Sequence, residues 1–196
     1  MTRTQIIILA AGASTRLGSP KQLLQWQGRS LLQHAVQTAA EVVPKPVVVL
    51  GANAAQLEAE LDTTLVQIVH NPSWQEGIAS SIHAGLSAVL NQPSPAEQVI
   101  FMVCDQPYVS ADLLKELISE QQQTGKAIVA SAYANTLGIP ALFTKTMFSQ
   151  LIDLQGDMGA KKIIQQHPAG TSAVNFPLGN IDIDTTEEYR NLMGMS

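Results

Sequence analysis

The sequence IIILAAGASTRLGSPK, residues 6–21, joins a strongly apolar run to a loop of small and basic residues. Residues 6–9 are continuously apolar, as is typical of a central parallel strand that is covered on both faces. The small residues at 10–14 allow backbone N–H groups to approach a charged ligand, and such groups commonly bind anions. Arg16 and Lys21 add two positive charges to the same segment. The segment therefore predicts a buried strand followed by a phosphate-binding loop.

Two common phosphate-binding motifs do not fit this loop. The P-loop pattern requires Lys directly after its second glycine, but Gly18 is followed by Ser19 and Pro20 before Lys21. The dinucleotide pattern G-x-G-x-x-G fails as well, because Ala13 and Ser14 follow Gly12. The loop has to be interpreted as a different kind of phosphate site.

Composition favours a compact chain that acts on small molecules. The chain has 196 residues, 45% hydrophobic and 14% charged, a size and composition that predict one folded domain, residues 1–196. A net charge of −5 argues against broad binding to nucleic acid or to anionic membranes. The single cysteine, Cys104, fits a reducing cytoplasm, and no apolar run has the length of a membrane span or a signal peptide.

Strand-like and helix-like segments alternate along the chain, which predicts βαβ units and a mainly parallel sheet. Strands are expected at 6–9, 47–50, 66–69, 99–103, 127–132, 139–143, 174–176 and 181–183, the sixth of them as a candidate for antiparallel pairing. Helices are expected at 31–43, 54–61, 78–90, 111–123, 144–154 and 160–166, with a last helix that ends near 193. Ser110 is expected to cap the fourth of these helices. Thr185 and Glu188 have the spacing of a capping box at the last one.

Acidic residues follow two of the expected strands. Asp105 comes at the end of strand 99–103, and ligands of open α/β sheets gather beyond the carboxyl ends of the parallel strands. Carboxylates, phosphates and water are the usual ligands of Mg²⁺. Asp182 and Asp184 alternate with apolar residues, so a strand at 181–183 would place both on one face. The residues alone leave open which of these two acts with Asp105, or whether they only favour the following helix.

Three motifs together resemble a known family. The loop L-A-A-G-x-S-x-R-x-G-x-x-K (9–21), the step P-K-Q-L-L (20–24) and the stretch C-D-Q-P (104–107) resemble the molybdenum cofactor cytidylyltransferase family, within the MobA-like nucleotidyltransferase superfamily. The resemblance implies a three-layer α/β/α, Rossmann-like (GT-A-like) fold with a mainly parallel mixed sheet. It also implies a Mg²⁺-dependent enzyme that transfers CMP from CTP to the phosphate of molybdopterin and releases pyrophosphate.

The resemblance further assigns roles to individual residues. Arg16 and Lys21 would be catalytic, and Asp105 and Asp184 would bind the metal. Nucleotide contacts would come from Leu9, Ala10, Ala11, Gly12, Ala13, Arg16, Lys21, Gly77 and Ser81. Segments 138–140 and 156–160 resemble the acceptor side of the family, and a transient contact with a molybdoenzyme or its chaperone fits the same picture.

Several alternatives stay open at this stage. Related guanylyltransferases more typically carry L-A-G-G, and the side chain of Ala11 favours a pyrimidine base, but GTP or another nucleotide and another phosphate-ester acceptor remain alternatives. A nucleotide-binding protein that delivers cofactor without catalysis is a further alternative. Ser81 is expected either to contact the nucleoside or to cap a helix, and Trp74 to pack in the core or in the substrate pocket. The scattered histidines do not support a zinc site, and Cys104 is expected to be a buried strand-end residue.

Overall fold

A computed structural model describes residues 2–14 and 17–194 of the chain. Its central feature is a mixed sheet with the strand order β5-β4-β1-β6-β8-β7-β9, and a separate short ribbon is formed by β2 and β3. The strands of the described residues are Thr4–Ala10 (β1), Gln25–Trp26 (β2), Arg29–Ser30 (β3), Val47–Leu50 (β4), Gln67–His70 (β5), Gln98–Val103 (β6), Ile128–Tyr133 (β7), Thr136–Thr144 (β8) and Thr171–Asn175 (β9).

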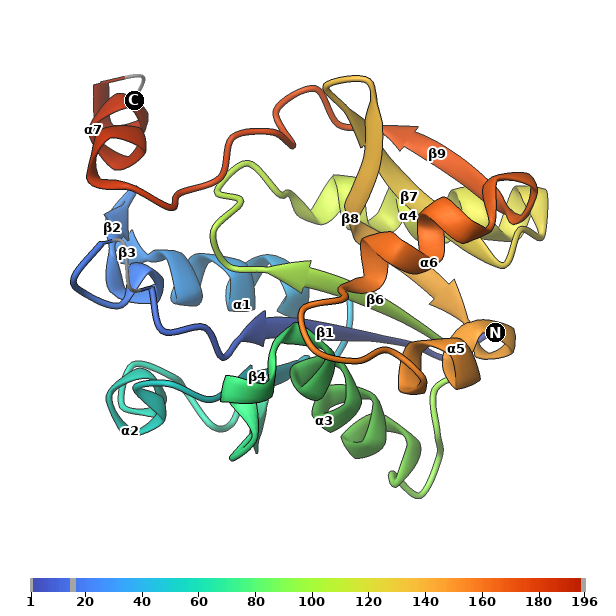
Figure 1. The fold of residues 1–196 in the computed structure, drawn as a ribbon, viewed down its shortest axis with the longest axis horizontal. Coiled ribbons are helices and arrows are strands. Elements are labelled where there is room, and N and C mark those ends of the chain that lie inside the picture. Colours follow the sequence, from blue (N-terminus) through green and yellow to red (C-terminus); the bar gives the residue numbers. More distant parts are fainter. Residues whose placement is uncertain (1, 15–16, 195–196) are drawn as a thin grey trace.

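Helices cover both faces of this sheet (Figure 1). The α-helices are Leu31–Ala40 (α1), Ala54–Glu58 (α2), Ile78–Leu90 (α3), Ala111–Thr124 (α4), Phe148–Ile152 (α5), Ala160–Gln166 (α6) and Thr186–Gly194 (α7). Short 3-10 turns occur at Lys21–Leu23 (η1), Trp74–Glu76 (η2), Lys145–Met147 (η3) and Pro168–Gly170 (η4). Among the described residues, 2–14 and 17–194, no helix is both long enough and apolar enough to cross a membrane.

Strand β1 explains why both faces of the sheet are covered. Ile6 and Ile8 pack into a core shared with α1, α2 and α4, whereas Ile7 and Leu9 pack into a core shared with α3, α5 and α6. Successive side chains of a strand point to opposite faces, so four apolar residues in a row require a helical layer on each side. The expected three-layer α/β/α architecture is confirmed.

Strand pairing confirms the expectation of a mainly parallel mixed sheet. β1 pairs in parallel with both β4 and β6, and β4 pairs in parallel with β5. β8 runs antiparallel to β6 and β7, which confirms the candidate antiparallel pairing of the strand expected at 139–143. The carboxyl ends of β1 and β6 therefore lie side by side, which brings the loop after residue 10 next to Asp105.

Most expected elements are present, with two corrections. The expected strand at 181–183 is wrong, because residues 181–184 have no regular secondary structure. The expected helix at 144–154 is divided into the turn η3 and the short helix α5. Ser110 caps α4 by accepting a hydrogen bond from the Leu113 N–H, as expected. The ribbon of β2 and β3 was not expected from the sequence.

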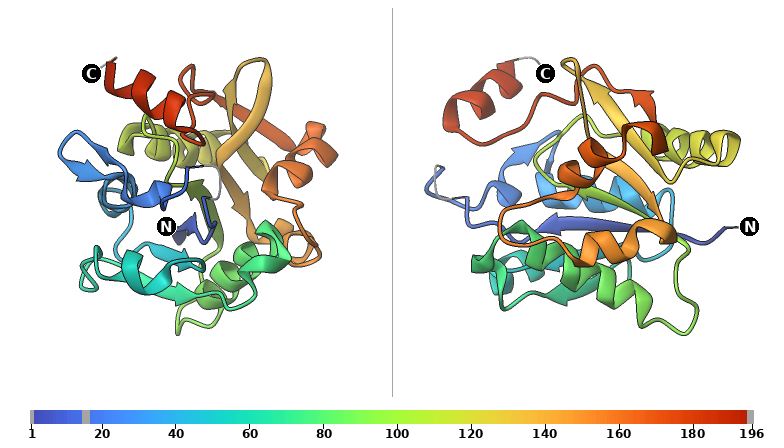
Figure 2. Two further views of the ribbon diagram at one scale, coloured as in Figure 1. Left: turned by 60° about the vertical axis from the view of Figure 1, so that its left-hand side comes forward. Right: turned by 45° about the vertical axis from the view of Figure 1, so that its right-hand side comes forward.

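The C-terminal helix packs beside the β2–β3 ribbon, on the side of the molecule opposite the N-terminus (Figure 1). After β9, residues 176–185 lead back across the molecule to α7, which lies beside the β2–β3 ribbon (Figures 1 and 2). Tyr189 donates a 2.8 Å hydrogen bond to the Gln25 carbonyl oxygen, and Ile183 and Leu192 pack against Trp26 in a small separate core. The expected capping box is confirmed: the Glu188 N–H donates to Thr185 Oγ1 at 3.2 Å, and the Thr185 N–H donates to Glu188 Oε2 at 2.8 Å.

Candidate active site

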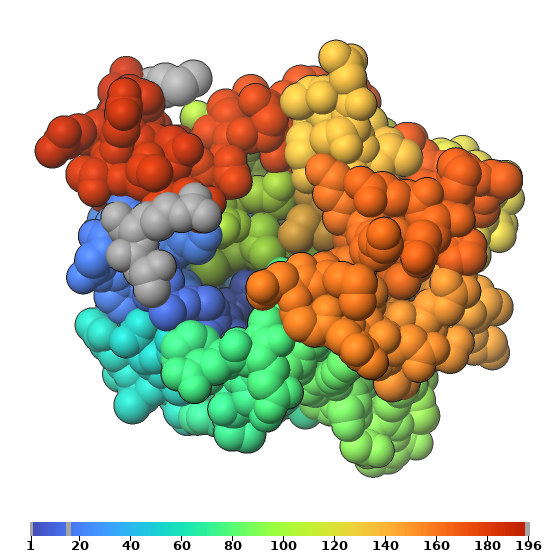
Figure 3. Space-filling model, viewed as in Figure 1, coloured from blue at the N-terminus to red at the C-terminus, as the bar shows by residue number. Residues whose placement is uncertain are grey.

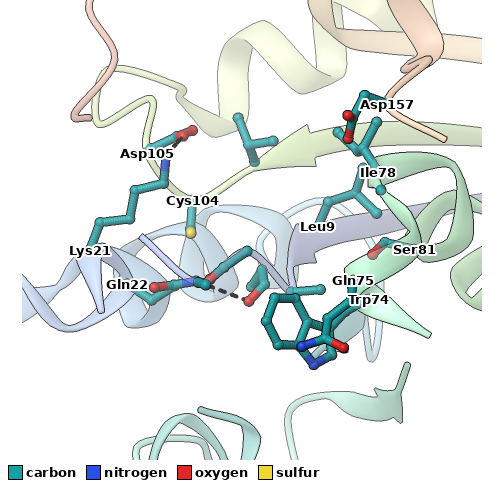
Figure 4. Close-up of a pocket in the computed structure, with 16 residues that line it drawn as sticks. Leu9, Lys21, Gln22, Trp74, Gln75, Ile78, Ser81, Cys104, Asp105 and Asp157 are labelled. Atoms are coloured by element: carbon teal, nitrogen blue, oxygen red, sulfur yellow. Dashed lines mark hydrogen bonds and ion pairs between the residues drawn. The ribbon is translucent and has the colours of Figure 1, made fainter. Parts of the chain in front are cut away.

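A cleft of about 360 Å³ opens beyond the carboxyl ends of β1 and β6. The surface is hollowed between the N-terminal segment, the β6 region and the C-terminal segment (Figure 3). Lys21 and Asp105 lie on one side of the cleft, and Trp74, Ser81 and Asp157 lie on the other (Figure 4). The lining includes these predicted site residues: Leu9, Ala10, Ala11, Gly12, Ala13, Lys21, Gly77, Ser81 and Asp105.

Lys21 connects the two predicted metal-binding aspartates. Its Nζ atom donates to Asp105 Oδ2 in a short contact and lies 2.6 Å from Asp184 Oδ1. The side chains of Lys21 and Asp105 are only 18% and 15% exposed, and that of Asp184 is 37% exposed. Three predicted residues from distant parts of the sequence therefore meet at one point.

The surroundings of Lys21 favour its charged form. Burial alone would lower the pKa of Lys21, but the negative charges and hydrogen bonds of Asp105, followed by those of Asp184, outweigh burial and raise its pKa above the usual value of 10.5. The ammonium group is consequently charged throughout the physiological pH range. It provides a permanent positive charge at the edge of the cleft.

The other oxygen of the Asp105 carboxylate has a different environment. Asp105 Oδ1 is buried and has no hydrogen-bond partner within the described residues. A buried carboxylate oxygen without a partner is costly, since it has lost its hydration. A cation placed in the cleft would supply the missing interaction, so the pair of Asp105 and Asp184 fits a divalent metal.

The loop that carries Asp105 is held from three directions. The Ile183 N–H donates to the Asp105 carbonyl oxygen at 3.0 Å, and Gln106 Nε2 donates to the Gly179 carbonyl oxygen at 2.9 Å. On the other side, His34 Nε2 of α1 lies 3.0 Å from the Pro107 carbonyl oxygen, and the His34 ring packs edge-on against Trp26. Burial lowers the pKa of His34, which favours the neutral ring with Nε2 as the donor.

Gln22 organises the loop after β1. Its side chain is only 1% exposed, and its Nε2 group donates to the carbonyl oxygens of Ala10 at 3.0 Å and Gly12 at 2.9 Å. Its Oε1 atom accepts a hydrogen bond from Ser14 Oγ at 3.2 Å. Sequence reasoning missed this role. A polar residue directly after Lys21 was the available signal, but its buried position depends on the fold.

The loop turns its carbonyl groups into the protein, whereas several of its N–H groups have no acceptor among the described residues. The Ala11 carbonyl oxygen accepts from the Ala52 N–H at 3.0 Å, so the carbonyl oxygens of residues 10, 11 and 12 all have protein donors. In contrast, the N–H groups of Gly12, Ala13 and Ser14 have no acceptor within the described part of the chain. Free N–H groups without nearby carbonyl oxygens are the arrangement that binds an anion.

Gly77 positions the opposite wall of the cleft. It has φ +105°, and a Cβ atom at this position would lie 2.3 Å from the Gly156 carbonyl carbon. The Ala79 N–H also donates to the Gly156 carbonyl oxygen at 3.0 Å. The glycine therefore allows the loop of Asp157 to pack against the start of α3. At Gly77 the close backbone approach is therefore one of the chain to itself.

Two serines at the start of α3 have different roles. Ser80 Oγ donates toward the carbonyl oxygens of Ser73 and Gly77, which ties down the turn before the helix. Ser81 lines the cleft, and its Oγ atom accepts a 3.0 Å hydrogen bond from Asn71 Nδ2. Trp74 both packs against the core and lines the cleft, so its two expected positions are combined.

The remaining candidate residues are placed as follows. Arg16 lies outside the described residues. Asp182 is exposed and forms no ion pair with Lys21, whereas Asp184 does. Cys104 is buried at the end of β6, and burial raises the pKa of its thiol to about 12, so the thiol is neutral. Among residues 2–14 and 17–194, no group of three or more His, Cys, Asp and Glu side chains is arranged to hold a metal.

Comparison with known proteins identifies the family of this chain. Residues 6–171 match the family described as the MobA-like NTP transferase domain. The chain belongs to this family. It is therefore a nucleotidyltransferase of the MobA-like type, as the sequence motifs implied.

Individual relatives of the family cover almost the whole chain. The nicotine blue oxidoreductase of Paenarthrobacter nicotinovorans is 29% identical over 201 residues, which cover 95% of each chain. The molybdenum cofactor cytidylyltransferase of Escherichia coli is 22% identical over 190 residues, 96% of this chain and 95% of the relative. The structure of Rv0371C from Mycobacterium tuberculosis in complex with manganese is similar with a TM-score of 0.81, 28% identity and full coverage of both chains.

Proposed function

We propose that residues 1–196 form one nucleotidyltransferase domain that transfers CMP from CTP to the phosphate of molybdopterin, with Mg²⁺ as its metal. The observation that supports this most strongly is the meeting of Lys21 with Asp105 and Asp184 beside a loop whose N–H groups have no acceptor among the described residues. A triphosphate needs amide donors and a cation, and its metal needs carboxylates. This cleft offers all of these groups within one site.

The triphosphate would occupy the side of the cleft formed by the loop after β1. The N–H groups of Gly12 and Ala13 would bind phosphate oxygens, and Lys21 would neutralise the negative charge that grows on the leaving pyrophosphate. Arg16 is proposed for the same task from its position in the motif. Groups that are already oriented toward the developing charge lower the barrier without further rearrangement.

Asp105 and Asp184 would hold the divalent metal. Their fit rests on the carboxylate pair itself and on the buried Asp105 Oδ1 atom, which has no partner among the described residues. When bound, the metal supplies charge neutralisation and orientation of the phosphates. The manganese in the structure of the mycobacterial relative supports a divalent ion of this kind.

The nucleoside would lie toward the other wall of the cleft. Ala11 is buried beneath it, and Trp74 and Ser81 line that side. The small Ala11 side chain reduces the space for a base relative to glycine, which supports a pyrimidine nucleotide, and the family resemblance supports CTP among these. The molybdopterin acceptor is supported by the name of the Escherichia coli relative.

The reaction is proposed as an in-line displacement. A phosphate oxygen of the acceptor attacks the α-phosphorus of CTP, a new P–O bond forms, and the bond to pyrophosphate breaks. No general base is needed when the acceptor phosphate is already a dianion. The protein then contributes mainly orientation and charge stabilisation, as in other phosphoryl-type transfers.

The decisive experiment measures product formation. The protein is incubated with Mg²⁺, molybdopterin and one nucleotide at a time, CTP, GTP, UTP or ATP, and pyrophosphate release is recorded. CTP is expected to give the fastest release. A faster reaction with GTP would overturn the base assignment, and binding of nucleotide without any pyrophosphate would favour cofactor delivery without catalysis. Release with another phosphate ester in place of molybdopterin would reassign the acceptor.

A second candidate function follows from one relative. The chain is 29% identical to a nicotine blue oxidoreductase, and the match extends over 95% of both chains. This candidate predicts a change in the visible absorption of nicotine blue in the presence of a reductant and no need for a nucleoside triphosphate. Bleaching of the dye together with no pyrophosphate release from any nucleotide would favour it over transfer.

A further inference from the structure

The position of the Lys21 ammonium group has a consequence for how the metal reaches its site. We propose that Lys21 is a resident counterion that keeps divalent metal away from Asp105 and Asp184 until a triphosphate draws the ammonium group away. The metal then enters together with the nucleotide rather than before it. This inference rests on the proposed function, because it takes the carboxylate pair as the metal site.

The distances leave no room for both cations on the same two carboxylate oxygens. Lys21 Nζ lies 2.6 Å from Asp184 Oδ1 and also contacts Asp105 Oδ2. A Mg²⁺ ion needs its oxygen ligands at about 2.0–2.1 Å. An ion that bound these same two oxygens would lie against the ammonium group, with like charges in contact. The ammonium group has to leave these two oxygens before a metal can bind them, and at Asp105 Oδ1 a metal would still face the like charge of the ammonium group on the same carboxylate.

A metal ion alone gains little from displacing Lys21. Within the described residues no third acidic, histidine or cysteine side chain completes a metal cage at this place, so the protein offers it only the two carboxylates. The displaced ammonium group would lose both of its charged partners. Lys21 is only 18% exposed, and removing the partners of a largely buried charge is strongly unfavourable.

A bound triphosphate would make it easier both to displace the ammonium group and to bind the metal. Lys21 is the first residue of η1, and its N–H donates to Ser14 Oγ at 3.0 Å. Lys21 is thus held against the loop whose N–H groups at 12–14 have no acceptor in the described part of the chain. Phosphate oxygens bound there would give the ammonium group new negative partners. The same phosphates would bring further oxygen ligands for the metal.

The test measures Mn²⁺ binding by equilibrium dialysis without any nucleotide. Lys21→Met keeps an unbranched side chain and removes the charge, so this variant is expected to bind one Mn²⁺ per chain at least tenfold more tightly than the natural protein. Lys115→Met serves as the matched control, because Lys115 is exposed on α4 and forms an ion pair with Asp112 at 3.8 Å, away from the cleft lining. The control is expected to bind Mn²⁺ like the natural protein.

Adding Asp105→Asn to Lys21→Met shows where the ion binds. The double variant is expected to lose the gained Mn²⁺ site, and a double variant that still holds the ion as tightly would overturn the proposal. Equal Mn²⁺ affinity of Lys21→Met and the natural protein would overturn it as well.

A second measurement needs only the natural protein. CTP or inorganic triphosphate, present on both sides of the dialysis membrane, is expected to raise protein-bound Mn²⁺ at least tenfold. Tight Mn²⁺ binding that is the same with and without either compound would overturn the inference. A rise with inorganic triphosphate but not with CTP would leave the inference intact and contradict the proposed nucleotide, so the two failures are distinguishable.

Discussion

The Ile183 N–H donates a 3.0 Å hydrogen bond to the carbonyl oxygen of Asp105. This bond joins the segment before α7 to the loop at the end of β6. Ile183 is completely buried in the small core with Trp26 and Leu192, so its position is firmly held. The next residue, Asp184, consequently reaches Lys21, while Asp182 lies on the exposed side.

This relationship predicts different effects for the two nearby aspartates. Asp184→Asn is expected to reduce turnover at least about 100-fold and to raise the Mg²⁺ concentration needed for half-maximal rate, because one charged contact of the reacting site is lost. Asp182→Asn is the matched control and is expected to change turnover less than threefold. Steady-state rates across a Mg²⁺ titration check both. Equal losses in the two variants would contradict the assignment of Asp184.

Gln22 is expected to control nucleotide affinity through the shape of the loop. Gln22→Met removes the donors for the Ala10 and Gly12 carbonyl oxygens while filling a similar volume, and leaving buried groups unpaired costs roughly 1–3 kcal/mol. We expect CTP binding at least tenfold weaker by calorimetry and a lower melting temperature. Gln123→Met, on the exposed face of α4, is the control. Unchanged CTP affinity in Gln22→Met would show that the loop keeps its shape without this side chain.

Gly77 is expected to tolerate no side chain. Gly77→Ala introduces a methyl group about 2.3 Å from the Gly156 carbonyl carbon at φ +105°, and the strained backbone alone costs on the order of 1–3 kcal/mol. Gly125→Ala is the matched control, since Gly125 has φ +63° but no atom within 4 Å of the added methyl group. Urea unfolding should show the larger loss of stability for Gly77→Ala. Similar losses in both variants would mean that the contact with Gly156 adds nothing.

His34 is expected to make the stability depend on pH in the acidic range. Burial lowers the pKa of His34 below 6.5, so the unfolded chain binds this proton more readily than the folded chain. The stabilising contribution is complete above pH 6.5 and is lost as the pH falls below that value. His34→Gln retains a donor for the Pro107 carbonyl oxygen without this titration, and its melting temperature should fall less between pH 7.5 and 5.5. An equal fall of the melting temperature in the variant and in the natural protein would show that other groups cause the acid sensitivity.

Much of the fold follows from local sequence patterns. The apolar run at 6–9 required cover on both faces of its strand, and helices α3 and α6 begin and end at the expected residues. Lys21 and Asp105 were identified from their motifs and from the position of strand ends, whereas Asp184 was assigned only by the family resemblance. These features depend on side-chain periodicity and on residue type, which are local properties.

Other features depend on contacts between distant segments. The expected strand at 181–183 does not form, because this segment is held by the bond from Ile183 to Asp105 and by burial of Ile183 rather than by a ladder partner. Its alternating pattern was therefore no guide to which aspartate meets Lys21. The role of Gln22 likewise requires the chain to bring its amide beneath the carbonyl groups of residues 10 and 12.

Sequence motifs thus named the charged groups and the sheet, whereas tertiary packing selected Asp184 over Asp182, oriented the N–H groups of the loop and placed the Lys21 ammonium group between two carboxylates. The physical reason is that residue type and periodicity are properties of neighbouring positions. The burial and pairing of a charge are properties of the space that distant segments enclose together.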